Sequence, residues 1–130
     1  MARILIVDDS QVELVHMVRI VEEMGHEALV ARSGEEGVLV ATQERPHVIV
    51  MDVVMPGVNG FQATRQIKHS AETRHIPIIM ASVKDQAVDI AWGQRQGADD
   101  YLVKPVLARD LMPAIDAALR SHSPSRNKRA

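Results

Sequence analysis

The chain has 130 residues, of which 46% are apolar, with a formal net charge of −2 and no cysteine. This length suffices for one domain with a buried core. The lack of cysteine excludes disulfides and cysteine-ligated metals, and the small charge by itself identifies no partner. No apolar run approaches the roughly 20 residues of a membrane span. We therefore expect a cytoplasmic domain that contacts no membrane.

Five short segments rich in branched aliphatic residues predict β-strands: residues 4–7, 28–31, 48–51, 76–82 and 101–103. Their apolar residues are continuous rather than alternating, which is typical of parallel strands covered on both faces. Longer stretches with helical signals separate them. Strands and helices thus alternate five times, which predicts an α/β fold with helices on both sides of one sheet.

Several residues indicate where the helices begin and end. Ser10 and Ser33, each followed three residues later by glutamate, can start helices through a capping box. Gly25 and Gly97 stand where the first and fourth helices are expected to end. Pro113 is expected in the first turn of the last helix, where a proline removes no intrahelical hydrogen bond.

The carboxyl ends of the predicted strands carry the polar residues of interest, because ligands of such folds bind at that edge of the sheet. The first strand is followed by Asp8 and Asp9, the third by Asp52, and the fifth by Lys104. The fourth strand ends in Ser82. Three carboxylates, one hydroxyl and one ammonium group are therefore expected to meet at one edge.

Carboxylates gathered in this way repel one another, each pair by about 4 kcal/mol at 4 Å and an effective dielectric constant of 20. Lys104 alone cannot neutralise three of them, whereas a divalent cation with oxygen ligands can. Mg²⁺ is the expected cation, with Mn²⁺ as a possible substitute. A cation, an ammonium group and a hydroxyl together suit a phosphoryl group. No glycine-rich nucleotide loop follows the first strand, so the candidate phosphoryl acceptor is a carboxylate.

Residues 3–120 resemble the receiver domain of two-component response regulators. The matching segments are VDD, MDVVMPGVNG, PIIMAS and YLVKP, which occur in the family's order and with similar spacing. The resemblance implies a doubly wound, flavodoxin-like sheet of five parallel strands in the order 2-1-3-4-5. The receiver domain is expected over residues 1–120, and the composition of residues 121–130, SHSPSRNKRA, predicts a flexible basic tail.

The resemblance also implies roles for the residues at the strand ends. Asp52 resembles the phosphoacceptor. Asp9, Asp52 and the backbone carbonyl of Val54 resemble the ligands of Mg²⁺, and Asp8 would bind the ion through a water molecule. Such a domain takes its phosphoryl group from a histidine kinase and promotes only its own phosphorylation and dephosphorylation, so it is not an enzyme in the usual sense.

The remaining implied roles concern switching. Ser82 would bind one phosphoryl oxygen and Lys104 another, and the Lys104–Pro105 peptide bond is expected to be cis. Tyr101 would move from an exposed to a buried position as Ser82 moves toward the phosphoryl group. This change would repack the face formed by the fourth helix, the fifth strand and the fifth helix, where a downstream protein would bind.

The fourth helix contributes candidate contact residues to that face. Val88 and Trp92, four residues apart, share one stripe, and together with Tyr101 they are predicted to contact the partner. Ala87 and Ala91 share a neighbouring stripe that can face the sheet.

The segments NGFQATRQ, KDQ and WGQRQGADDYLVKPV further resemble the stand-alone PilH-type regulators of type IV pilus twitching motility. The domain would then act either as a messenger or as a phosphate sink. It would be a monomer or a phosphorylation-dependent dimer. Without a DNA-binding segment, no nucleic acid partner is expected. Two alternatives stay open: an interaction domain that does not depend on phosphorylation, and a Mg²⁺-dependent aspartyl phosphatase. The phosphatase would need an acid two residues after the nucleophile, where this chain has Val54.

Overall fold

Five parallel strands form one sheet in the order β2-β1-β3-β4-β5 in the computed structural model, which describes residues 1–121. This order confirms the predicted topology. The strands are β1 Arg3–Val7, β2 Glu27–Ala31, β3 Val48–Asp52, β4 Ile78–Ser82 and β5 Asp100–Val103. Three of them, β1, β3 and β4, lie inside the sheet and are almost wholly buried, as their continuous apolar sequences predict.

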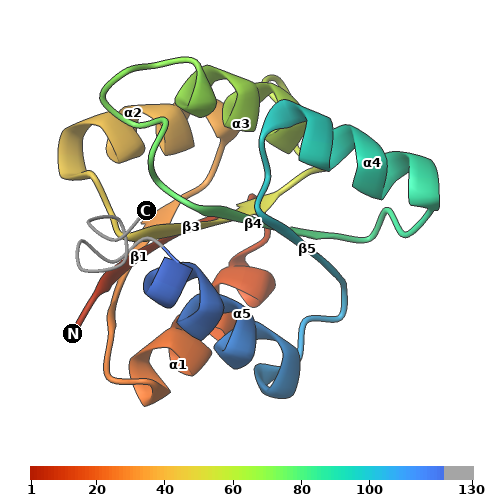
Figure 1. The fold of residues 1–130 in the computed structure, drawn as a ribbon. Helices are drawn as coiled ribbons and strands as arrows, with labels where there is room; N and C mark the ends of the chain where they lie inside the picture. Colours follow the sequence, from red (N-terminus) through yellow and green to blue (C-terminus); the bar gives the residue numbers. More distant parts are fainter. Residues whose placement is uncertain (122–130) are drawn as a thin grey trace.

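One helix follows each strand. The helices are α1 Gln11–Glu23, α2 Gly34–Glu44, α3 Gly60–Lys68, α4 Ala87–Gln96 and α5 Ala108–Ser121. Figure 1 shows α1 and α5 on one side of the sheet and α2, α3 and α4 on the other. The predicted three-layer arrangement is therefore confirmed.

Successive residues of each buried strand enter different cores because side chains alternate across a sheet. In β1, Ile4 and Ile6 belong to the core beneath α1 and α5, whereas Leu5 and Val7 belong to the core beneath α2 and α3. A strand between two cores needs apolar residues at every position, which explains its uninterrupted aliphatic sequence.

The predicted helix boundaries agree with the structure at four positions. The hydroxyls of Ser10 and Ser33 accept hydrogen bonds from the backbone N–H groups three residues later, at 3.3 and 3.1 Å, so each serine is the N-cap of its helix. Within residues 1–121 neither glutamate returns the second bond of the predicted capping box, and Glu36 instead accepts from the N–H of Arg32. Gly97 ends α4 with a φ of 111°, and Gly25 follows α1 with a φ of 84°. Both glycines supply the left-handed backbone that commonly ends a helix.

Pro113 was wrongly expected in the first turn of α5. The helix begins at Ala108, and the carbonyl of Leu107 accepts from the N–H groups of Asp110 and Leu111, so Pro113 lies in the second turn. There its ring leaves the Arg109 carbonyl without the usual N–H donor. Pro113 is exposed, so water can reach this side of the helix.

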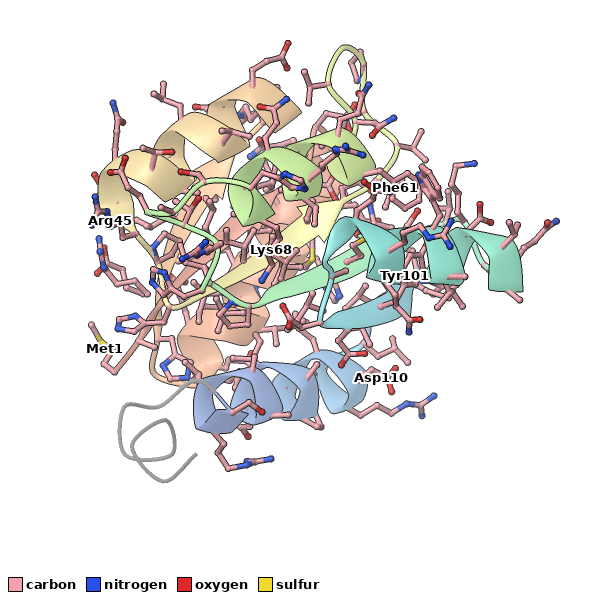
Figure 2. All side chains as sticks on the ribbon, turned by 45° about the horizontal axis from the view of Figure 1, so that its top comes forward. Met1, Arg45, Phe61, Lys68, Tyr101 and Asp110 are labelled. Atoms are coloured by element: carbon pink, nitrogen blue, oxygen red, sulfur yellow. The ribbon has the colours of Figure 1, made fainter. Side chains whose placement is uncertain are left out.

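The stripe of α4 that faces the sheet also differs from the prediction. Ala87 and Ala91 are exposed, whereas the buried residues of α4 are Gly93 and Gln96. A Cβ atom at Gly93 would lie 2.8 Å from the sulfur of Met80 and 3.2 Å from the ring of Tyr101. Figure 2 labels Tyr101 beside this helix. The missing side chain of Gly93 therefore sets how closely α4 approaches β5.

Within residues 1–121, no helix is both long enough and apolar enough to cross a bilayer. The predicted tail over residues 121–130 lies outside the described residues, except for Ser121, which is the last residue of α5.

Candidate functional site

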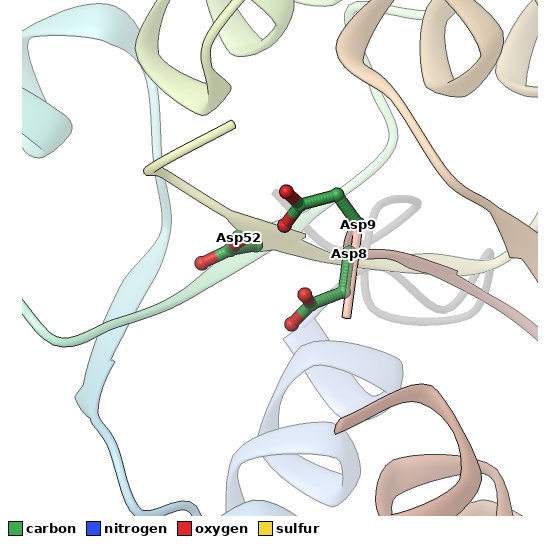
Figure 3. A group of neighbouring side chains, drawn as sticks. All are labelled: Asp8, Asp9 and Asp52. Atoms are coloured by element: carbon green, nitrogen blue, oxygen red, sulfur yellow. The ribbon is translucent and has the colours of Figure 1, made fainter. Parts of the chain in front are cut away.

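Three carboxylates lie together at the carboxyl edge of the sheet. Asp8 and Asp9 follow β1, and Asp52 is the last residue of β3 (Figure 3). The strands pair in parallel with Val7 opposite Met51, so the residues that follow them are neighbours. One oxygen atom of each carboxylate lies within 4.8 Å of the others. The predicted convergence of these three side chains is therefore present in the structure.

Lys104 reaches the same cluster from the end of β5. Its Nζ atom lies 2.8 Å from Oδ2 of Asp8 and 3.2 Å from Oδ1 of Asp52. The second oxygen of Asp8 accepts from the backbone N–H of Ser10 at 2.9 Å. Asp8 is fully buried, and the side chain of Lys104 is only 9% exposed. This ion pair therefore lies inside the protein, and the Lys104–Pro105 bond that follows it is cis, as expected.

The charges of this cluster do not balance. Burial and the negative charge of Asp8 raise the pKa of Asp52 from 3.8 to about 6, although Lys104 acts in the opposite direction. Burial by itself would lower the pKa of Lys104, but its hydrogen bond to Asp8 and the charge of Asp52 outweigh burial and raise it. The positive charge of Lys104 therefore does not fully offset burial and the negative charge of Asp8, and Asp52 ionises less readily than a free aspartate.

The donor atoms fit a divalent cation. All three side chains offer carboxylate oxygens, and Asp9 is exposed and forms no ion pair among the described residues. The backbone carbonyl of Val54, predicted as a further ligand, makes no hydrogen bond within residues 1–121. Lys104 compensates one of the three negative charges, so a bound dication would bring the cluster to neutrality. Hard oxygen donors of this kind suit Mg²⁺ or Mn²⁺.

Ser82, the last residue of β4, and Tyr101, near the start of β5, both hydrogen-bond the backbone of Lys84. Ser82 is fully buried, and its hydroxyl accepts from the backbone N–H of Lys84 at 3.1 Å. The Tyr101 hydroxyl donates to the backbone carbonyl of Lys84 at 2.7 Å, and burial raises the pKa of Tyr101. Lys84 thereby joins the two side chains for which the sequence predicts a coupled movement. The movement itself stays a prediction.

The predicted contact residues occupy two sides of α4. Val88 and Trp92 are 68% and 48% exposed, and they line a shallow groove with Ala91 and Arg95. Tyr101 is half-buried and packs near Gly93 on the opposite, buried side of the helix. Val88 and Trp92 thus form an exposed pair, and Tyr101 lies behind them.

Gly60 is a residue of the site that reasoning from the sequence missed. A Cβ atom there would lie 2.0 Å from the backbone oxygen of Asp52, and the N–H of Gly60 donates to the carbonyl of Val53 at 2.9 Å. Only a residue without a side chain lets α3 begin directly against the backbone of the candidate acceptor. Two glycines shortly after Asp52, in the segment PGVNG, were the available signal.

The chain was compared with known proteins. The family model described as the response regulator receiver domain matches residues 4–116. The protein PilH of Pseudomonas aeruginosa is 54% identical over 119 residues, which cover 92% of this chain and 98% of PilH.

Solved structures agree with this match. The receiver domain of a signal transduction histidine kinase from Syntrophus aciditrophicus is 31% identical, with a TM-score of 0.88 over 95% of this chain and 94% of that one. The chemotaxis protein CheY4 of Vibrio cholerae is 28% identical, with a TM-score of 0.86 over 92% of this chain and 99% of that one. This chain belongs to the response regulator receiver domain family.

Proposed function

We propose that this protein is a single-domain response regulator that accepts a phosphoryl group from a histidine kinase on Asp52. The observation that carries the proposal is the position of Asp52 between two further carboxylates and the ammonium group of Lys104. A carboxylate oxygen of Asp52 would attack phosphorus as the bond from phosphorus to the histidine nitrogen breaks. The leaving imidazole would then take a proton from solvent.

The surrounding residues would divide the work of binding the phosphoryl group. When bound, Mg²⁺ would supply positive charge to the phosphoryl oxygens, held by Asp9, Asp52 and the Val54 carbonyl directly and by Asp8 through water. Lys104, already 3.2 Å from Asp52, would pair with one phosphoryl oxygen. The Ser82 hydroxyl, which now only accepts from the N–H of Lys84, would donate its hydrogen to another phosphoryl oxygen.

The proposed output is a change in the face formed by α4, β5 and α5. The receiver domain would span residues 1–120, act in the cytoplasm, and either bind a downstream protein or drain phosphoryl groups from its kinase, as a monomer or a phosphorylation-dependent dimer. The likeness to PilH supports a role in type IV pilus twitching motility. The proposed partners are proteins, and neither nucleic acid nor a membrane is among them.

Acetyl phosphate tests the phosphoacceptor role. The protein is incubated with Mg²⁺ and acetyl phosphate, and its intact mass is followed over time beside Asp52→Asn and a sample with chelator. The expected result is a gain of one phosphoryl group that both controls lack. An equal gain in Asp52→Asn would contradict the proposal. Partner binding that Asp52→Asn leaves unchanged would favour an interaction domain that does not depend on phosphorylation.

The partner surface has its own test. Trp92→Ala should weaken binding to the downstream protein about tenfold or more if the exposed tryptophan is an anchor of the interface. The control is Val12→Ala, which truncates a more exposed apolar side chain, on α1, away from this surface. Both variants should still be phosphorylated at the wild-type rate. Unchanged partner affinity in Trp92→Ala would remove this residue from the interface.

A further inference from the structure

The connection between β5 and α5, residues 104–107, carries Lys104 into the site. The backbone N–H of Lys104 donates to the carbonyl of Ser82 at 2.8 Å, which fixes the start of this connection. The carbonyl of Leu107 accepts from Leu111 at 2.9 Å, which fixes its end in the first turn of α5. Between these two points lie Pro105, which has no N–H group, and Val106, whose side chain is buried in the core.

His16 of α1 holds the middle of this connection. Its Nε2 atom lies 2.5 Å from the backbone carbonyl oxygen of Val106. Because a carbonyl oxygen can only accept, Nε2 must carry the hydrogen and donate. Among residues 1–121, His16 is the only side chain that hydrogen-bonds the backbone of residues 105–107.

We propose that His16 is a positioning residue for Lys104, acting through the carbonyl of Val106. The inference rests on the proposed function, because it matters only if Lys104 binds the phosphoryl group. Lys104 must place Nζ within hydrogen-bond distance of Asp8 and Asp52 at once, at 2.8 and 3.2 Å. The backbone two residues further along is tied to α1, so the stem of the lysine side chain starts from a fixed point.

This bond also links the site to a surface. His16 is an exposed residue, and it borders a shallow pocket lined by Val12, Glu13, Pro105, Val106 and Leu107. A protein that covers this part of α1 would therefore touch the side chain that holds the Lys104 connection. The hydrogen bond between His16 and Val106 thus connects the exposed face of α1 to the backbone that carries Lys104, in addition to the core packing between them.

Two substitutions separate the hydrogen bond from the side-chain volume. His16→Leu introduces an apolar side chain of similar length and removes the Nε2–H donor. His16→Gln places an amide N–H group near the position of Nε2 and should restore the bond. The matched control is His75→Leu, which replaces an exposed histidine that makes no hydrogen bond within the described residues.

The first measurement is the rate of phosphoryl gain from acetyl phosphate at saturating Mg²⁺. His16→Leu should lower the maximal rate constant about three- to tenfold, less than the roughly hundredfold loss that a full ångström of misplacement can cause. His16→Gln should recover most of the wild-type rate, and His75→Leu should match it. In a Lys104→Ala background, His16→Leu should cause no further loss, because its effect passes through the lysine.

The second measurement is hydrogen exchange of the Lys104 backbone N–H group, which donates to the Ser82 carbonyl, followed by NMR without phosphodonor. Loosening the connection in His16→Leu should speed this exchange about threefold or more, with recovery in His16→Gln and no change in His75→Leu. An unchanged exchange rate at Lys104 in His16→Leu, or an equal loss of rate in the Lys104→Ala background, would overturn the inference. Failure of the wild type to gain a phosphoryl group would contradict the proposed function, while the exchange rate would still decide the role of His16.

Discussion

Asp52 combines two properties that oppose each other in a folded protein. It is 4% exposed, yet the function proposed for it requires an ionised carboxylate. Burial and the charge of Asp8 raise its pKa to about 6, so at neutral pH the protein holds the ionised form at a cost in stability. A carboxylate held in this way is ready to bind a cation and to attack phosphorus.

The first prediction concerns this cost. In the unfolded chain Asp52 has its ordinary pKa of 3.8, so above about pH 6 ionisation favours the unfolded state. Asp52→Asn removes this penalty, and its free energy of unfolding at neutral pH without metal should exceed that of the wild type by about 1–3 kcal/mol. The difference should shrink as the pH falls from about 6 toward 4, where wild-type Asp52 takes up a proton.

Urea unfolding of both proteins in chelator, at several pH values, measures this difference. Asp9→Asn is the matched control, because Asp9 is exposed and outside the ion pairs with Lys104. It should change stability little at any of these pH values. A wild type more stable than Asp52→Asn at neutral pH would show that the ion pair with Lys104 outweighs the burial of Asp52.

A second prediction at this scale concerns two buried threonines. Thr64 on α3 is fully buried, and its hydroxyl has no hydrogen-bond partner among residues 1–121, whereas the hydroxyl of Thr73 donates to the carbonyl of Ile67 at 2.7 Å. Thr64→Val should stabilise the protein by about 1 kcal/mol, because it removes an unsatisfied polar group. Thr73→Val should destabilise it by about 1–2 kcal/mol. Thermal unfolding measures both, and equal effects would contradict this reading of Thr64.

At the scale of elements, the short connection from β3 to α3 fixes where the candidate acceptor lies. Gly60, the first residue of α3, lies against the backbone of Asp52 and Val53. Asn59 and Gln62 cap this helix through reciprocal hydrogen bonds of 2.9 and 3.0 Å. Helix α3 therefore begins beside the site with the N–H groups of Gly60 and Gln62 already hydrogen-bonded.

Replacing Gly60 should displace this helix start. The Cβ atom of Gly60→Ala would lie 2.0 Å from a backbone oxygen that cannot move alone, so we expect a loss of about 3 kcal/mol or more in unfolding free energy. The control is Gly25→Ala, whose Cβ atom would meet no atom of residues 1–121 within 4 Å but whose backbone has a φ of 84°. Backbone strain alone should cost it about 1–2 kcal/mol. A smaller loss in Gly60→Ala than in Gly25→Ala, by urea unfolding, would contradict the clash.

The elements also show what the sequence could predict. Runs of aliphatic residues located all five strands. In β1, β3 and β4 the reason is burial between two cores, which needs apolar side chains at every position, whereas the edge strands β2 and β5 are partly exposed. The buried face of α4 was harder to predict, since this helix lies against Met80 and Tyr101 at Gly93, which has no side chain to mark the position as buried. Alanines at 87 and 91 suit a buried stripe by composition, but α4 is rotated so that they face solvent. That rotation depends on Met80 and Tyr101, which come from other parts of the chain.

The functional site could likewise be predicted only in part. Its charged residues could be predicted because each stands at the end of a strand, and parallel strands end at one edge. The contacts that hold them could not, because they join distant segments through backbone groups. The bond from His16 to the carbonyl of Val106 joins α1 to the connection between β5 and α5, 90 residues later in the chain, and nothing in either local sequence indicates it. The sequence shows a glycine at position 60, but it does not show that this glycine lies against the backbone of Asp52.

At the scale of the whole molecule, the sheet brings one cluster of negative charge to one edge between two helical layers. A cation bound there should stabilise the native state, because the unfolded chain does not gather these carboxylates. At about ten times its dissociation constant, Mg²⁺ should add about 1.4 kcal/mol to the free energy of unfolding. Thermal unfolding with increasing Mg²⁺ measures this gain. Asp9→Asn, which should leave the metal-free stability intact, should lose most of it, and an equal gain in both proteins would place the ion elsewhere.

The central claim is that Asp52 carries the phosphoryl group, and borohydride trapping tests it most directly. Borohydride reduces an aspartyl phosphate to homoserine, and peptide mass spectrometry then locates the altered residue. After treatment with acetyl phosphate and Mg²⁺, the account predicts homoserine at position 52 and at no other aspartate, with none in the absence of Mg²⁺. Homoserine at position 8 or 9, with Asp52 unchanged, would contradict it.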